Sequence, residues 1–368
     1  MRDKIKTLKT IVIKIGSNLL TRDDGELNGE RIDALALEVG ALLKAGRRVV
    51  IISSGAVAAG RGMIGITGRP TTLPEFQAAA AAGQIALMQR YFIAFGRGGV
   101  NVAQLLLTRD DFGERTRYLN IRNCLAHLLD HGVVPIINEN DPVAVDELKF
   151  GDNDILAGYV TTGLMADLLV ILTSVEGLLG PDRKVIPEVA AVDESIDKLV
   201  FAGTTSMGMG GMASKISTAR VVTASGEAVV IADGRRPGVL ADIFAGREVG
   251  TLFLPAPRKL TGRQRWMAFS ARETGSVTVD AGAVRAICGK GTSLLPAGIT
   301  AVTGDFASGA LVAIRDEAGA VIAKGLTNYS AEEIGRIKGM QTKQIAKVLG
   351  YAPYHEVIHR DNLVLAGK

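Results

Sequence analysis

Two short clusters of carboxylate and carboxamide side chains stand out in this chain of 368 residues. The first reads Asn-Glu-Asn-Asp over residues 138–141, and the second reads Gly-Asp-Asn-Asp over residues 151–154. Such side chains can accept hydrogen bonds from an ammonium group, bind a cation or orient a lysine. One Asx-rich loop usually does no more than make a turn. Two of them so close together indicate a polar binding site.

A lysine lies inside the first apolar run of the chain. Residues 10–15 predict a buried β-strand, and Lys14 is its one charged member. Burying an ammonium group is costly unless it has anionic partners or reaches solvent. Gly16 and Ser17 follow at once, so the chain could turn closely beneath a phosphate that Lys14 contacts. A lysine that extends to solvent from an edge strand explains this motif equally well.

Two segments rich in small residues lead into predicted helices. In residues 53–56, Ser-Ser-Gly-Ala, the Ser54 hydroxyl and the following backbone N–H groups could bind an anion, while Ser54 could also cap the helix. Residues 203–215 form a glycine-rich loop that feeds a helix carrying Lys215 in its first turns, which suits a triphosphate. Its spacing does not match a P-loop.

The elements that must position these residues follow a simple order. Amphipathic segments such as residues 115–131 separate strand-like runs, and this alternation predicts a mainly parallel sheet sandwiched by helices. In such sheets, ligands bind beyond the carboxyl ends of the strands. Residues 138–141 directly follow the strand-like run 133–137 and are therefore expected at such an end. The strand-like runs are residues 10–15, 49–52, 100–107, 133–137, 168–172, 228–231 and 251–254.

The pattern changes after residue 254. A basic stretch punctuated by proline follows, and from residue 276 short β-like runs at 276–279, 310–314 and 320–323 are separated by glycine-containing turns. The chain is therefore expected to divide into an α/β domain, a linker, a small mostly-β domain and a C-terminal tail. The expected ranges are 1–256, 257–275, 276–355 and 356–368.

Composition excludes several classes of protein. Apolar residues make up 47% of the chain and charged residues 22%, as in an ordinary globular enzyme, and a net charge of +4 is too small to indicate nucleic acid. Cys124 and Cys288 lie far apart and outside any disulfide or zinc motif. The chain starts without a signal-peptide pattern, and polar residues interrupt its most apolar helical stretch, 76–95, so a cytoplasmic protein is expected.

Two histidine pairs raise the question of a metal site. Residues 355–359 match the H-E-x-x-H pattern of zinc peptidases, which needs a helix and a further ligand downstream. Pro353 precedes the motif, only Asp361 follows it, and the segment is expected to be β-rich. His127 and His131 lack a third ligand nearby and indicate a solvated helix face. No metal held by protein side chains is expected.

Taken together, the motifs resemble the amino-acid kinase family. They are Lys14-Ile15-Gly16-Ser17 and residues 53–56, 138–141, 151–154 and 210–215, in this order. The chain looks most similar to members that transfer the γ-phosphoryl group of ATP to the side-chain carboxylate of L-glutamate, the first step of proline biosynthesis. From about residue 276 it looks like a PUA domain. The resemblance covers almost the whole chain.

The resemblance implies a role for each motif. Lys14 and Lys215 would cancel charge between the approaching anions, and Asp154 would orient both lysines. Mg²⁺ would be carried by the nucleotide phosphates. The residues similar to the family's glutamate-binding set are Ser54, Asp141 and Asn153. Those similar to its ATP-binding set are Lys14, Thr173, Ser174, Met209, Gly210, Gly211, Met212, Ala213, Ser214 and Lys215.

Some features depart from this pattern or leave alternatives open. Ser174 stands where the family often has aspartate, and residues 177–187 look short, which affects the expected base and ribose contacts. Sister kinases acting on acetylglutamate, aspartate, carbamate or a nucleoside monophosphate are the nearest rivals. PUA domains elsewhere bind RNA, but residues 276–368 hold 10 Lys and Arg against 8 Asp and Glu. The family also implies feedback inhibition by proline and homo-oligomers, either dimers or tetramers.

Overall fold

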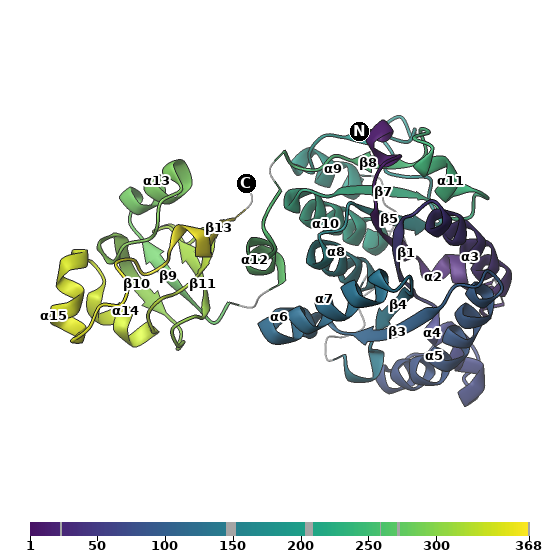
Figure 1. The fold of residues 1–368 in the computed structure, drawn as a ribbon, viewed down its shortest axis with the longest axis horizontal. Helices are drawn as coiled ribbons and strands as arrows, with labels where there is room; N and C mark the ends of the chain where they lie inside the picture. The colour runs from purple at the N-terminus through teal and green to yellow at the C-terminus, as the bar shows by residue number, and fades with distance from the viewer. Residues whose placement is uncertain (23, 145–151, 203–208, 258, 271–272, 367–368) are drawn as a thin grey trace. The chain divides into compact units, whose positions relative to one another are not determined.

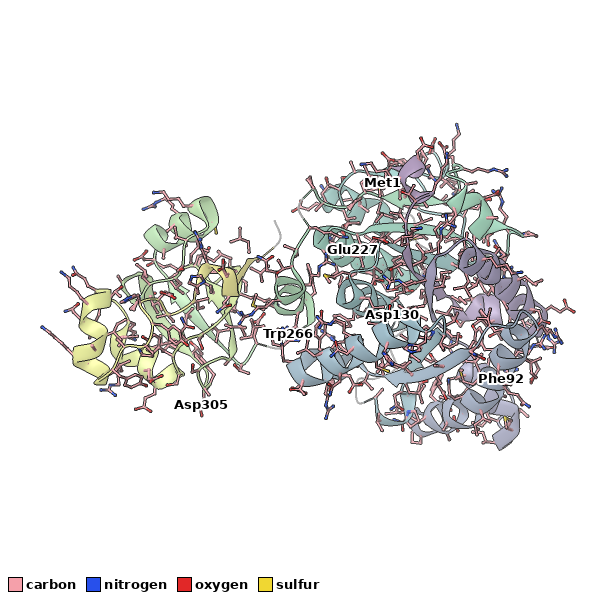
Figure 2. The ribbon with its side chains drawn as sticks, in the orientation of Figure 1. Met1, Phe92, Asp130, Glu227, Trp266 and Asp305 are labelled. Carbon is pink, nitrogen blue, oxygen red and sulfur yellow. The ribbon has the colours of Figure 1, made fainter. Side chains whose placement is uncertain are left out.

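The computed structural model describes residues 1–22, 24–144, 152–202, 209–257, 259–270 and 273–366 (Figure 1). The chain forms two compact units. The first comprises Met1–Asp111 and Thr116–Lys259, and the second comprises Phe112–Arg115 and Leu260–Lys368. Side chains fill the interior of each unit (Figure 2).

An eight-stranded sheet forms the centre of the first unit, with the strand order β3-β4-β2-β1-β5-β7-β8-β6. Among the described strands, neighbours run parallel except β7 and β8. The predicted mainly parallel sheet is therefore confirmed, and each predicted run coincides with a strand. The two-residue β6 was not predicted. The strands are β1 (Thr10–Ile15), β2 (Arg48–Ile52), β3 (Val102–Leu107), β4 (Val134–Glu139), β5 (Leu168–Thr173), β6 (Glu188–Val189), β7 (Ala228–Asp233) and β8 (Thr251–Phe253).

Helices cover both faces of this sheet (Figure 1). One layer contains α3 and α5, and the other contains α8 and α10. The described helices of this part of the chain are α1 (Arg2–Ile5), α2 (Ser17–Leu20), α3 (Gly29–Lys44), α4 (Ala56–Arg61), α5 (Leu73–Gly96), α6 (Arg109–Gly113), α7 (Arg115–Asp130), α8 (Asp152–Leu164), α9 (Glu194–Ala202), α10 (Met209–Ser225) and α11 (Val239–Phe244), with 3-10 turns η1 (Gly62–Ile64) and η2 (Asp141–Val143).

The central position of β1 decides where Lys14 points. Strand β1 lies between β2 and β5, and its six residues are all buried. Ile11, Ile13 and Ile15 pack into the core that contains the buried residues of α3 and α5. Because successive side chains of a strand point to opposite faces, Lys14 faces α8 and α10 instead. The alternative of an edge-strand lysine that extends to solvent is wrong.

Helices α4 and α5 approach each other closely enough to fix the turn after β2. A Cβ atom on Gly60 would lie 1.9 Å from the carbonyl oxygen of Ala79, and one on Gly83 would lie 1.9 Å from that of Ala56. Only glycine allows the two backbones to pack this way. The start of α4 is thereby held against the part of α5 that carries Gln84.

The second unit is built on a five-stranded sheet with the order β10-β9-β11-β12-β13. Strands β9 and β11 run parallel, and the other pairs run antiparallel. The predicted mostly-β domain is confirmed. Its elements are β9 (Gly275–Val279), β10 (Ile299–Thr303), β11 (Leu311–Arg315), β12 (Val321–Leu326) and β13 (Leu363–Leu365), with α12 (Gly262–Arg265), α13 (Ala281–Lys290), α14 (Ala331–Ile337), α15 (Ile345–Leu349) and short turns η3 (Trp266–Ser270), η4 (Pro296–Gly298), η5 (Thr342–Gln344) and η6 (Arg360–Asn362).

Both ends of this unit differ from the expected outline. Residues 257–275, expected as a linker, contain α12 and the π-helical turn η3, and Arg265 at the end of α12 is buried. Residues 356–368, expected as a tail, supply β13 and the buried Val357 and Ile358. No helix forms over residues 355–359, as predicted, so H-E-x-x-H has no helical geometry. Among the described helices, none is long and apolar enough to cross a bilayer.

Candidate active site

Three charged side chains meet at the carboxyl end of β1. The Lys14 Nζ atom lies 2.6 Å from Oδ1 of Asp154, and the Lys215 Nζ atom lies 3.0 Å from Oδ2 of the same carboxylate. Ser214 donates a hydrogen bond of 2.7 Å to that Oδ2 atom, and Lys215 also donates to the carbonyl oxygen of Gly211 at 2.9 Å. One carboxylate therefore holds two ammonium groups side by side.

Burial makes this cluster electrostatically strong. The exposed fractions of the Lys14 and Asp154 side chains are 7% and 1%. Burial lowers the pKa of Lys14 below its ordinary value, although the charge of Asp154 opposes the shift. Burial alone would raise the pKa of Asp154, yet Lys14 and Lys215 outweigh it and lower that pKa. The cluster has two positive charges against one negative charge, so its net charge of +1 favours an anion nearby.

Two helix starts bring these groups to β1, and both correct the sequence prediction. Residues 151–154 were expected as a polar loop, but α8 begins at Asp152, so Asn153 and Asp154 lie in its first turn. Residues 203–215 were expected as a glycine-rich loop that feeds a helix carrying Lys215 in its first turns. Lys215 does lie near the start of a helix, but α10 begins at Met209, earlier than expected, and includes Gly210 and Gly211. Asp, Asn and Gly favour helix starts as well as loops, so composition could not separate the two. Gly151 and residues 203–208 lie outside the described part of the chain.

A chain of neutral hydrogen bonds lies beside the charged cluster. The amide nitrogen of Asn153 donates to the Ser54 hydroxyl and to Oδ1 of Asn138, both at 3.1 Å. Asn138 in turn donates to Oε1 of Gln84 at 2.9 Å. Sequence reasoning missed Gln84, whose one signal is a polar residue within an apolar, Ala-rich helical stretch. These hydrogen bonds connect four segments: α8, the turn after β2, β4 and α5.

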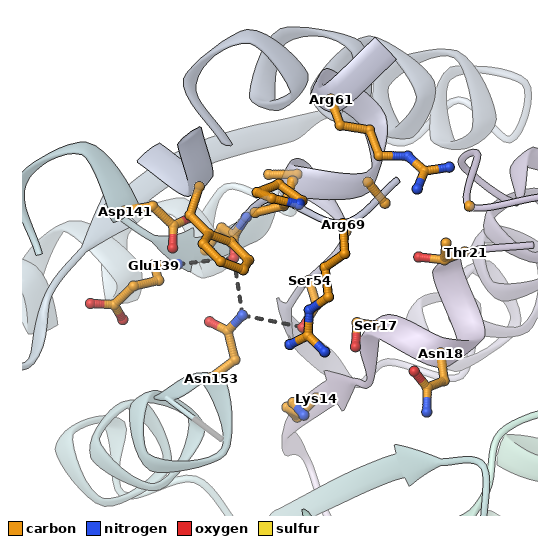
Figure 3. A pocket seen from close by; sticks show the side chains of 18 residues that line it. Lys14, Ser17, Asn18, Thr21, Ser54, Arg61, Arg69, Glu139, Asp141 and Asn153 are labelled. Carbon is orange, nitrogen blue, oxygen red and sulfur yellow. Dashed lines mark hydrogen bonds between the residues drawn. The ribbon is translucent and has the colours of Figure 1, made fainter. Parts of the chain in front are cut away.

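A cavity of about 520 Å³ is lined by members of both the charged cluster and the hydrogen-bond chain (Figure 3). Ser54 reaches it because Gly55, with φ of 95°, turns the chain sharply from β2 into α4. The predicted Lys14, Ser54, Asp141 and Asn153 all line the cavity, and so do Asn138 and Glu139. Arg61 and Arg69 also line it and were not predicted. Acidic and basic groups thus surround one space of small-molecule size.

The residues similar to the family's nucleotide-binding set lie near the carboxyl end of β1, as the charged cluster does. Thr173 ends β5, the neighbour of β1, and Ser174 follows it. Neither lines the cavity described above. The first two turns of α10, where the backbone N–H groups of a helix start favour an anion, contain Met209, Gly210, Gly211, Met212, Ala213, Ser214 and Lys215.

The described residues offer no cluster of three or more His, Cys, Asp or Glu side chains suited to a metal ion. His127 on α7 and His131 directly after it are exposed, and the Nδ1 atom of His131 lies 2.8 Å from the carbonyl oxygen of His127. The site described above is instead dominated by lysine, carboxylate and amide groups. Such a set can neutralise and orient anions.

Comparison with known proteins agrees with this geometry. The model of the amino acid kinase family matches residues 9–233, and that of the PUA domain matches residues 275–349. The chain is 47% identical over 365 residues to glutamate 5-kinase of Moorella thermoacetica, covering 98% of this chain and 97% of that protein. It is 46% identical over 370 residues to glutamate 5-kinase of Syntrophotalea carbinolica, covering 99% of both chains.

A solved structure is similar in fold. The crystal structure of N-acetylglutamate synthase from Neisseria gonorrhoeae superimposes with a TM-score of 0.51 at 19% identity, covering 77% of this chain and 67% of that chain. This likeness concerns the fold alone. The family models, the full-length relatives and the sheet order agree, and the chain belongs to the amino acid kinase family, with the glutamate 5-kinases as relatives and a C-terminal PUA domain.

Proposed function

We propose that the protein transfers the γ-phosphoryl group of ATP to the side-chain carboxylate of L-glutamate, forming L-glutamyl 5-phosphate and ADP in the first step of proline biosynthesis. The observation that carries this proposal is the buried cluster in which Asp154 holds Lys14 and Lys215 at 2.6 Å and 3.0 Å. The names of the full-length relatives support the choice of glutamate.

The proposed reaction needs charge cancellation more than acid–base chemistry. A carboxylate oxygen of glutamate attacks the γ-phosphorus, and the bond from that phosphorus to the β–γ bridging oxygen breaks, leaving its electron pair on ADP. The nucleophile is already ionised, so no base has to remove a proton. Two anions must still approach each other, and Lys14 and Lys215 stabilise the charge that gathers on the transferred group. Asp154 aims both ammonium groups.

The substrate side of the cavity suits a free amino acid. We assign glutamate binding to Ser54, Asp141 and Asn153, which line the cavity beside Lys14. The Oδ1 atom of Asn153 is buried and has no hydrogen-bond partner among the described residues. A buried acceptor of this kind is costly unless a ligand satisfies it, and the α-ammonium group of the substrate would donate to it.

We assign the nucleotide to the opposite side, at Thr173, Ser174 and the first turns of α10. The backbone N–H groups of Gly211 and its neighbours at the start of this helix would receive phosphate oxygens, with Lys14 and Lys215 beside them. Mg²⁺ would travel with the nucleotide and add positive charge between its β and γ phosphates. It needs no dedicated protein cage in this arrangement.

Other properties of the protein follow from the same relationship. We expect a cytoplasmic homo-oligomer that is inhibited by proline, and we expect residues 1–256 to form the catalytic domain. These expectations rest on the family rather than on a contact in this chain.

Competing substrates test the proposal directly. ATP consumption by the purified protein would be measured with L-glutamate, N-acetyl-L-glutamate and L-aspartate, and the acyl phosphate would be trapped as a hydroxamate with hydroxylamine. We expect trapping and turnover with L-glutamate alone. Faster turnover with either competitor would overturn the assignment of the substrate.

A further inference from the structure

The cavity carries more positive charge than phosphoryl transfer uses. Besides Lys14, its lining includes Arg61 and Arg69, which come from α4 and from the segment between η1 and α5. Lys215 does not line this cavity and belongs to the α10 side. The two arginines therefore stand apart from the cluster that we assign to the transferred group.

An amino-acid substrate has three charged groups, and each needs a partner in a confined site. The reacting carboxylate belongs next to Lys14, at the end of β1. Glu139 and Asp141, at the end of β4 and in η2, offer negative charge for the α-ammonium group. The α-carboxylate is left, and it requires a cation on the cavity wall.

We propose that Arg69 binds the α-carboxylate of the amino-acid substrate, an inference that rests on the function proposed above. In Figure 3 the Arg69 guanidinium group reaches into the cavity toward Ser54 and Ser17, while Asp141 and Glu139 lie on the other side of Asn153. A guanidinium group can donate two parallel hydrogen bonds to one carboxylate, which fixes orientation as well as charge. Arg69 thus distinguishes a free α-carboxylate from a neutral group.

Arg61 acts as a positioning residue for this contact. Its guanidinium group donates to the carbonyl oxygen of Gly68 at 3.1 Å and to that of Asp24 at 2.5 Å. The first of these bonds is made to the residue directly before Arg69. Arg61 therefore ties the loop that carries Arg69 to α4 and to the segment after α2.

The nucleotide is the competing ligand for Arg69. Its phosphates belong with Lys14, Lys215 and the start of α10, which cover one face of β1. Arg69 instead arrives with Ser54 from the α4 and α5 side, where the substrate residues gather. The placement favours the amino acid.

The test compares Arg69→Met with the wild-type protein on two substrates. L-isoglutamine keeps the side-chain carboxylate and the α-ammonium group of L-glutamate but has a neutral α-carboxamide. We expect R69M to raise the KM for L-glutamate about 10- to 100-fold, as loss of a charge-assisted contact would do, with the KM for ATP within about 2-fold. The wild-type preference for L-glutamate over L-isoglutamine should disappear in R69M.

Three further variants complete the design. Arg69→Lys should restore part of the preference, because it keeps the charge without the bidentate geometry. Arg61→Met should raise the KM for L-glutamate less than R69M and retain part of the preference, since Arg69 remains. Arg285→Met removes an exposed arginine from α13 in the second unit and should change neither constant.

Two results would overturn the inference. One is an R69M protein that still prefers L-glutamate over L-isoglutamine as the wild type does. The other is an equal rise in the KM values for ATP and L-glutamate, which would assign Arg69 to the nucleotide. If the wild-type protein does not phosphorylate L-glutamate at all, the proposed function itself fails, and this outcome is distinct from both.

Discussion

The phosphoryl-transfer side of the site is held together by charges, whereas the substrate side is held together by neutral amides. On the first side, Asp154 binds two lysines in ion pairs that are almost completely buried. On the second, Gln84, Asn138, Asn153 and Ser54 form a chain of uncharged hydrogen bonds. The charged side chains can stabilise the negative charge that develops on the transferred phosphoryl group. The amide side chains can orient the substrate through hydrogen bonds without adding charge to the site. Damage to the first side should therefore lower kcat, and damage to the second should mainly raise KM.

The largest effect is expected from removing either lysine. Lys14→Ala and Lys215→Ala should each lower kcat by about 10²- to 10⁴-fold, because each removes a positive charge from the transferred group. Steady-state kinetics would measure the loss, and thermal unfolding would show that the variants are folded. Lys184→Ala, at a side chain that is 84% exposed, is the matched control. Near-normal turnover in either lysine variant would contradict the proposal that this lysine stabilises charge on the transferred group.

Asp141→Asn should have the next largest effect, on substrate affinity. It removes a negative charge from the cavity wall and keeps the shape of the side chain, so the α-ammonium group loses a charged partner. We expect the KM for L-glutamate to rise about 10- to 100-fold while the KM for ATP changes little. Equal changes in the two KM values would argue against a role on the substrate side.

Asn138→Leu tests the amide chain itself. This side chain is 3% exposed, and leucine would leave Gln84 and Asn153 without their shared partner. We expect the free energy of unfolding to fall by about 1–3 kcal/mol, and the KM for L-glutamate to rise several-fold as Asn153 loses its orientation. Chemical denaturation and kinetics would measure the two effects. A fall in kcat without a change in KM would contradict the division between the two sides.

The smallest effect is a displaced pH profile that sharpens the comparison. Burial lowers the pKa of Lys14 below the ordinary lysine value of 10.5. Its ammonium form is the active one, so kcat/KM should fall as pH rises through this lowered pKa. Bound phosphates favour the ammonium form, and the corresponding fall in kcat should come at higher pH. In Lys14→Arg, the residual activity should not show this fall at high pH, because arginine stays protonated. A fall that persists in that variant would belong to another group.

Local patterns predicted the framework of the site well. The apolar run of β1, with a single lysine, gave both the strand and the residue that needs anionic partners, and alternation along the strand explains the face on which Lys14 lies. The spacing of apolar runs likewise predicted the parallel sheet. These features depend on neighbours within a few residues, which sequence periodicity records.

Contacts between distant segments were beyond the reach of such patterns. No local sequence pattern indicates that Asp154 contacts both Lys14 and Lys215. That expectation came from the resemblance to the family. The bond from Asn138 to Gln84 and the position of Arg69 were not foreseen at all, because each depends on how α5 and its preceding loop pack against the sheet. The start of α8 was predicted to be a loop, and the start of α10 was predicted too late in the chain, since helix starts and turns favour the same residue types.

Asn153 and Asp154 are consecutive residues in the first turn of α8, yet one belongs to the amide chain and the other to the ion-pair cluster. A rigid turn cannot adjust one of them independently of the other. Amino-acid binding that shifts Asn153 would therefore also shift Asp154 and the lysines that the nucleotide contacts. By thermodynamic linkage each substrate would change the affinity for the other by the same factor. The peptide bond between these two residues would then make the enzyme's two substrates heterotropic effectors of each other.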